Sequence, residues 1–107
     1  MFDVLIIGGG ASGVSCALIL GSAQNKPYAE SKKIGILTHQ KASALRDAVF
    51  NNAYGIPAGK LGKDLMDESL QQLTDLYPHV EQIEKEKVMK VEGEAGNFTV
   101  TTNKNSY

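Results

Sequence analysis

The chain has 107 residues, of which 42% are apolar, and this size and composition are typical of one globular domain over residues 1–107. Its formal net charge of −1 comes from 11 basic and 12 acidic side chains. Because these charges are interspersed, we expect no basic face that would bind a nucleic acid. Cys16 has no partner for an internal disulfide, which is typical of the reducing cytoplasm, and one cysteine with two histidines excludes a zinc site.

The apolar run from Val4 to Gly21 predicts neither a signal peptide nor a membrane span. Asp3 precedes it where a signal peptide carries positive charge, and glycines and serines interrupt it. The run instead predicts a strand over Phe2–Ile7 that is buried on both faces of a parallel sheet. A mostly buried helix from Ala11 to about Leu20 is expected to follow it.

The next segments predict the rest of a strand–helix–strand unit. A polar connection is expected over Gly21–Lys33, and a second parallel strand over Ile34–Thr38. Gln40–Phe50 has a helical pattern. Asn51–Gly62 contains a proline and three glycines and is expected to be a loop, and loops of this length are usually functional.

A second helix is expected to be capped by Asp64 and to end at Pro78. Its apolar stripe consists of Met66, Leu70, Leu73 and Tyr77. The C-terminal part is expected to be a small antiparallel meander. Its strands are predicted at Val80–Ile83, Val88–Glu92 and Phe98–Thr102. The fold class is therefore α/β, with a small parallel sheet of Rossmann-like type and this meander beside it.

A G-x-G-x-x-G motif lies between the first strand and the first helix, the context in which it predicts dinucleotide binding. Gly8 permits a tight turn, Gly10 lets the backbone approach a pyrophosphate, and Gly13 lets helix and strand pack closely. The alternative is that the glycines only pack the turn. The predicted pyrophosphate-binding residues are Gly8, Gly9, Gly10, Ala11, Ser12 and Gly13.

The acidic residue that usually binds the ribose at the end of the second strand is missing. Thr38 and His39 occupy that place, and Glu30 precedes the strand at the wrong edge of the sheet. We expect either that Thr38 or His39 contacts the adenosine ribose more weakly, which we favour, or that the nucleotide site has decayed. Arg46 and Lys41 are candidates to pair with a phosphate, with a solvated position as the alternative for each.

Three segments resemble a known family. In order, they are FDVLIIGGGASGVSCALIL, NNAYGIPAGKLGKDLM and FTVTT. They are similar to the N-terminal half of the FAD domain of thioredoxin-reductase-like flavoproteins of the pyridine nucleotide-disulfide oxidoreductase superfamily. The resemblance covers essentially the whole chain, with a poor fit over Gly21–Lys33. It implies a partial FAD/NAD(P)-binding fold in which the glycine motif holds FAD and Asn52 offers its amide to the flavin or ribityl chain. A turn-forming asparagine is the alternative for Asn52.

The sequence lacks several parts that members of that family have, including the NAD(P)H domain and the Cys-x-x-Cys pair. Cys16, on an apolar helix, is expected to be a buried structural thiol, and His79 a surface histidine. We identify no catalytic acid, base or nucleophile, so these residues are not expected to catalyse a reaction by themselves.

We therefore expect the FAD-binding N-terminal portion of an NAD(P)H-dependent flavoprotein oxidoreductase without its own redox disulfide. One alternative is a stand-alone NAD(P)-binding module, which without an acid at the second strand would favour NADP. The other is a non-enzymatic truncated remnant. An exposed sheet edge in an incomplete domain favours a homo-oligomer or a complementary chain as partner.

Overall fold

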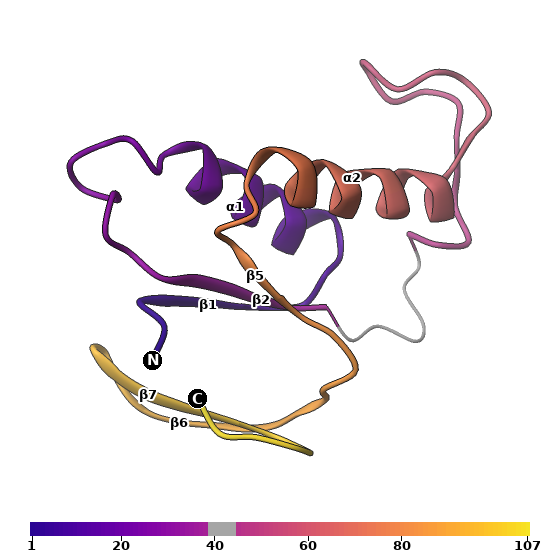
Figure 1. The fold of residues 1–107 in the computed structure, drawn as a ribbon. Helices are drawn as coiled ribbons and strands as arrows, with labels where there is room; N and C mark the ends of the chain where they lie inside the picture. The colour runs from indigo at the N-terminus through magenta and orange to yellow at the C-terminus, as the bar shows by residue number, and fades with distance from the viewer. Residues whose placement is uncertain (39–44) are drawn as a thin grey trace.

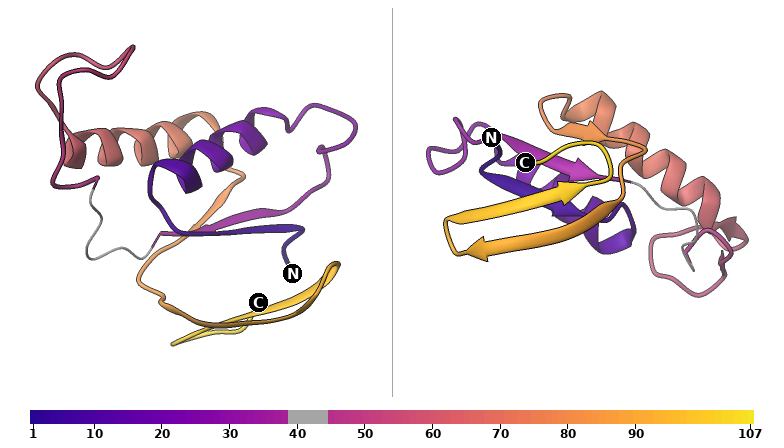
Figure 2. Two further views of the ribbon diagram at one scale, coloured as in Figure 1. Left: turned by 180° about the vertical axis from the view of Figure 1, so that it is seen from behind. Right: turned by 90° about the horizontal axis from the view of Figure 1, so that it is seen from below.

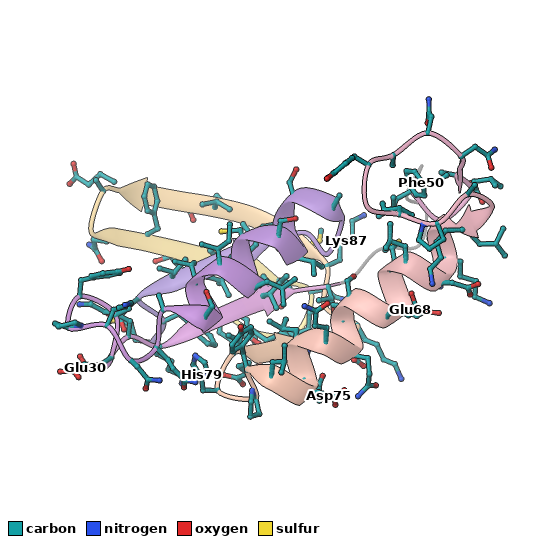
Figure 3. The ribbon with its side chains drawn as sticks, turned by 90° about the horizontal axis from the view of Figure 1, so that it is seen from above. Glu30, Phe50, Glu68, Asp75, His79 and Lys87 are labelled. Atoms are coloured by element: carbon teal, nitrogen blue, oxygen red, sulfur yellow. The ribbon has the colours of Figure 1, made fainter. Side chains whose placement is uncertain are left out.

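The structure of the protein is a computed structural model, which describes residues 1–38 and 45–107. Helix α1 (Ala11–Ser22) and helix α2 (Gly62–Leu76) lie side by side on one face of a parallel sheet, as Figures 1 and 3 show from two directions. Within the described residues, neither helix is long and apolar enough to cross a bilayer.

The parallel sheet contains β1 (Val4–Ile7), β2 (Ile34–Leu37) and β5 (Glu81–Ile83) in the order β1-β2-β5. Val4 lies opposite Ile34 in the first pair of strands, and Gly35 opposite Glu81 in the second. The predicted strand–helix–strand unit is therefore confirmed. All carboxyl ends of the strands meet at one edge of the sheet, beside the N-terminus of α1 (Figure 1).

The antiparallel part of the fold is a hairpin of β6 (Val88–Glu94) and β7 (Asn97–Thr102). It covers the face of the sheet opposite the helices, so the molecule has three layers (Figure 2). The strand predicted at residues 80–83 exists, but it pairs with β2 in the parallel sheet and does not belong to a meander.

Two apolar clusters hold the layers together. The cluster between helices and sheet is built on Val14, Ala17, Ile34, Ile36, Leu73 and Val80. The cluster between sheet and hairpin is built on Leu37, Ile83 and Val100. Leu70 and Tyr77 pack against the first cluster, which confirms the predicted stripe of α2. Because β2 is central, both of its faces are buried in these clusters.

The first strand and helix are less buried than predicted. β1 has one neighbour in the described sheet, and Ile7 is 50% exposed. In α1, the buried residues Val14, Ala17 and Gly21 lie on one face. The prediction of a buried thiol at Cys16 is wrong: this residue lies on the exposed side of the helix.

The segment before α2 also differs from expectation. Residues 45–47 form a turn, and β3 (Val49–Phe50) pairs with β4 (Lys60–Leu61), so the predicted helix is wrong for the described part of residues 40–50. α2 begins at Gly62 rather than at a cap by Asp64, which lies in the first turn. Gly62 is tightly packed at this start, since a Cβ at position 62 would lie 1.6 Å from the carbonyl oxygen of Leu45.

Candidate dinucleotide site

The turn between β1 and α1 depends on two glycines in the way the motif predicts. Gly8 has a φ of +109°, a conformation that side chains disfavour, and its amide donates to the Leu37 carbonyl at 2.9 Å. A Cβ at Gly13 would lie 1.8 Å from the carbonyl oxygen of Gly8. The predicted roles of Gly8 in the turn and Gly13 in helix–strand packing are therefore confirmed.

The N-terminus of α1 presents backbone donors at the carboxyl edge of the sheet. Gly10 is the N-cap residue, and its carbonyl accepts the first helical hydrogen bond, from the Val14 amide at 3.0 Å. The amides of Ala11, Ser12 and Gly13 precede that bond and have no acceptor within the helix. The first turn contains no acidic residue, so its positive end is available to an anion.

A cleft with a volume of about 170 Å³ lies between the glycine turn and the start of α2. It is lined by Gly9, Gly10, Ala11, Val14, Ser15, Leu18, Leu45, Leu65, Met66 and Ser69. Of this lining, the sequence predicted Gly9, Gly10 and Ala11 as site residues and did not reveal the apolar wall that α2 provides. The one sequence feature that pointed to this wall is the predicted apolar stripe, which places Met66 on the inner face of α2.

Thr38 lies directly against the glycine turn. A Cβ added to Gly9 would lie 3.1 Å from both the Cα and the Cβ of Thr38, so a side chain at position 9 would crowd this contact. The Thr38 amide and hydroxyl donate to the Ile83 carbonyl at 3.0 and 3.4 Å. The predicted ribose-binding place at the end of β2 therefore adjoins the predicted pyrophosphate site. His39 and Lys41 lie outside the described residues.

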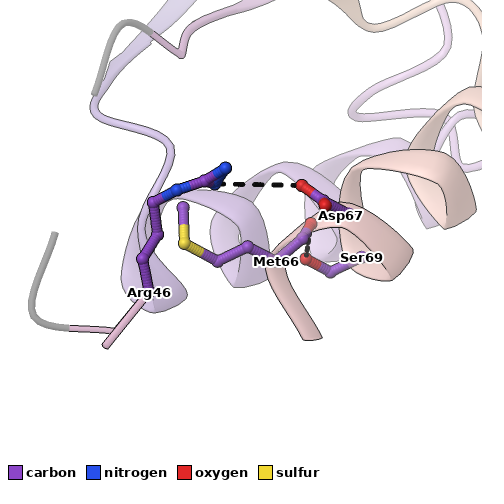
Figure 4. A network of polar contacts seen from close by, with 4 residues as sticks. All are labelled: Arg46, Met66, Asp67 and Ser69. Carbon is purple, nitrogen blue, oxygen red and sulfur yellow. Dashed lines mark hydrogen bonds and ion pairs between the residues drawn. The ribbon is translucent and has the colours of Figure 1, made fainter. Parts of the chain in front are cut away.

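Arg46 lies beside α2 rather than beside the amides of α1. Its guanidinium is 3.9 Å from a carboxylate oxygen of Asp67, and its side chain passes Met66 (Figure 4). The same view shows the Ser69 hydroxyl, which donates to the Met66 carbonyl at 2.9 Å. Both charged side chains of the ion pair are substantially exposed, so the pair is weak and leaves Arg46 able to exchange partners.

Asn52 lies in the loop that joins β3 to β4 and projects from the layered part of the molecule (Figure 1). The residue is exposed. Its neighbour Asn51 holds the loop closed, since its Oδ1 accepts from the Gly59 amide at 2.9 Å. The structure thus assigns turn formation to Asn51, and flavin contact by Asn52 stays a prediction.

The other potentially reactive side chains lie apart from this site. His79 is exposed, as predicted, and lines a polar hollow with Glu30 at the opposite end of the helices (Figure 3). Among the described residues, no three or more His, Cys, Asp and Glu side chains gather in a way that could hold a metal ion.

No family model and no curated protein sequence matches the chain significantly. Solved structures do match it. The oxidoreductase from Agrobacterium tumefaciens is 29% identical, with a TM-score of 0.77 over 97% of this chain and 32% of that one. The thioredoxin reductase from Streptococcus pyogenes is 25% identical, with a TM-score of 0.76 over 100% of this chain and 32% of that one.

A third match is a ferredoxin-flavin thioredoxin reductase from Clostridium acetobutylicum. It is 22% identical, with a TM-score of 0.70 over 99% of this chain and 34% of that one. This chain has the fold of part of a thioredoxin reductase. It spans about a third of the length of the structures it matches. The predicted α/β class and partial Rossmann-like fold are therefore confirmed.

Proposed function

We propose that this chain binds FAD as the dinucleotide-binding part of an NAD(P)H-dependent, thioredoxin-reductase-like flavoprotein oxidoreductase. The observation that carries the proposal is the glycine turn. Gly8 and Gly13 hold β1 and α1 so close that a Cβ at position 13 would overlap the Gly8 carbonyl, and this contact aims the free amides of α1 at the carboxyl edge of the sheet.

The described residues fit the pyrophosphate of FAD. An anion at the start of α1 meets the helix dipole and the amides of Ala11, Ser12 and Gly13. Gly10 brings no side chain to this place, and its φ of −80° is one that any residue adopts, so its value lies in the space it leaves.

The ribose end fits less well. In place of a carboxylate that accepts two ribose hydroxyls, the structure offers Thr38, whose hydroxyl already has an acceptor at 3.4 Å. We therefore expect ribose contact from Thr38 or from His39 to be weaker than from an acidic residue. Most of the binding free energy is expected from the pyrophosphate and from the apolar wall at Leu65 and Met66.

FAD, when bound, supplies the electron-transfer chemistry, and these residues bind and orient it. The chain holds no pair of cysteines for disulfide exchange, because Cys16 is its only one. The oxidoreductases to which it is similar in fold include one named for its flavin, and this favours FAD over NADP. The loop at Asn52 supports the same choice through its resemblance to the family.

The proposal is tested by titrating the purified chain with FAD and, separately, with NADPH, while unfolding by urea is followed. Free FAD at about 100 times its dissociation constant is expected to raise the unfolding free energy by about 2.7 kcal/mol. Stabilisation by NADPH alone would show a nucleotide module of the NADP type instead. Stabilisation by neither ligand would support the decayed site and reject the proposal.

A further inference from the structure

Thr38 is the residue through which the end of β2 packs against the glycine turn. It follows β2 directly. Among the described residues, the three heavy atoms nearest to a Cβ built at Gly9 all belong to Thr38. They are its Cα and Cβ at 3.1 Å and its methyl carbon Cγ2 at 3.3 Å. Distances of this length are tighter than most real Cβ contacts, so a side chain at position 9 has room only if Thr38 moves.

The two branches of the Thr38 side chain have different neighbours. The hydroxyl donates to the Ile83 carbonyl at 3.4 Å, and the Thr38 amide donates to the same oxygen at 3.0 Å. The methyl carbon lies on the side of Gly9. The hydroxyl therefore faces the end of β5, and the methyl group faces the glycine turn.

The backbone ties the glycine turn to the same end of β2. The Gly8 amide donates at 2.9 Å to the carbonyl of Leu37, which precedes Thr38. One hydrogen bond and one packed contact, at neighbouring residues of both segments, thus fix the separation between the turn and β2. Gly10 follows directly as the N-cap of α1, so this separation also decides where the free amides of α1 lie.

We propose that Thr38 is a positioning residue for the pyrophosphate site, and this inference rests on the proposed function. Its methyl group packs against Gly9 and holds the glycine turn, with the free amides of α1, at the place where the pyrophosphate binds. The groups of a binding site must be held within about 0.5 Å of their productive positions, so a small shift of the turn lowers affinity. The methyl group, and not the hydroxyl, accounts for the contribution of Thr38 to FAD affinity.

Two substitutions at position 38 separate the methyl group from the hydroxyl. Thr38→Val keeps a methyl group toward Gly9, whereas Thr38→Ser keeps the hydroxyl. In both variants the backbone amide of position 38 stays as a donor to the Ile83 carbonyl. We expect Thr38→Val to bind FAD within about twofold of the unsubstituted chain, and Thr38→Ser to bind at least about fivefold more weakly. Equal affinities of the two variants, or the reverse order, would overturn the inference.

Gly9→Ala presses on the same contact from the side of the turn. We expect it to weaken FAD binding at least about fivefold in the unsubstituted chain. In the Thr38→Ser chain its effect is expected to be at least about twofold smaller, because the missing methyl group gives the new Cβ part of the room it needs. Purely additive effects of the two substitutions would contradict a shared contact.

Flavin fluorescence measures these affinities under conditions in which urea denaturation shows every variant to be folded. A loss of stability alone then leaves the affinity unchanged. Nuclear magnetic resonance of the FAD-free chain gives a second readout. The Gly10 and Ala11 amide signals are expected to move in Thr38→Ser and Gly9→Ala and to stay in place in Thr38→Val. If the unsubstituted chain binds no FAD, the proposed function fails, and these signals still show whether Thr38 positions the turn. Unmoved signals in Thr38→Ser would reject that role.

Discussion

At the scale of single residues, position 13 has no room for any side chain. The 1.8 Å separation between a Cβ at this position and the Gly8 carbonyl oxygen is shorter than any real contact of these atoms. Gly13→Ala therefore forces helix and strand apart. We expect a loss of about 3 kcal/mol or more in the unfolding free energy, measured by urea denaturation.

Ser12→Ala is the control for Gly13→Ala. Ser12 is the exposed neighbour in the same helical turn, and its replacement is expected to change stability by less than about 0.5 kcal/mol. Equal effects of the two substitutions would contradict the packing role of Gly13.

Glu86 is a buried carboxylate beneath the C-terminal residues. It accepts hydrogen bonds from the Thr102 hydroxyl at 2.7 Å, the Asn105 amide at 3.0 Å and the Tyr107 hydroxyl at 2.8 Å. The Thr102 hydroxyl, followed by Asn105, Tyr107 and the charge of Lys104, lowers the pKa of Glu86 below 4.5 against the opposing effect of burial. The charged form is therefore the one that the fold stabilises.

The lowered pKa has a defined consequence for stability in acid. An unfolded chain takes up the proton of Glu86 near pH 4.5, before the folded chain does, so this contribution is complete above pH 4.5 and is lost as the pH falls through the folded pKa. Glu86→Gln is expected to unfold more easily at neutral pH and to lose less additional stability below pH 4.5. Urea denaturation at several pH values measures both effects, and parallel pH profiles of the two proteins would contradict the account.

At the scale of elements, α2 is held mainly by its inner stripe. Leu73 is fully buried between α2, α1 and the sheet, whereas Leu76 is 55% exposed. Leu73→Ala is expected to cost about 2–5 kcal/mol of unfolding free energy, and Leu76→Ala less than about 1 kcal/mol. Thermal unfolding followed by circular dichroism compares them, and similar costs would show that the stripe is not the packed face.

The elements that sequence could predict are those whose pattern matches a local period. β1, α1, β2 and the stripe of α2 follow from apolar spacing and glycine position. The helical pattern of Gln40–Phe50 failed over its described part because a turn at residues 45–47 places the Leu45 carbonyl against Gly62. Burial of Cys16 failed because only the face of α1 that carries Val14, Ala17 and Gly21 packs against the rest of the structure. Contacts between distant segments decide both features.

The residues of the candidate site were likewise predictable from the sequence only in part. The glycine turn and Thr38 were predictable because a motif and the end of a strand locate them. The wall at Leu65 and Met66, and the pairing of Arg46 with Asp67, depend on how α2 lies beside α1. No spacing in the sequence encodes that arrangement.

At the scale of the whole molecule, the carboxyl ends of the three parallel strands lie beside the turn that holds the free amides of α1. This edge is where open α/β sheets bind their ligands.

The most direct test of the central claim is an equilibrium titration of flavin fluorescence with the unsubstituted chain and with Gly10→Val. The φ of Gly10 is −80°, which any residue adopts, so the valine is expected to fill the pyrophosphate place without strain in φ. Ala23→Val, at the far end of α1, adds similar bulk as a control. We expect FAD to bind the unsubstituted and control chains, and Gly10→Val to bind at least about tenfold more weakly. Equal affinity of all three chains, or no binding by the unsubstituted chain, would contradict a pyrophosphate site at the glycine turn.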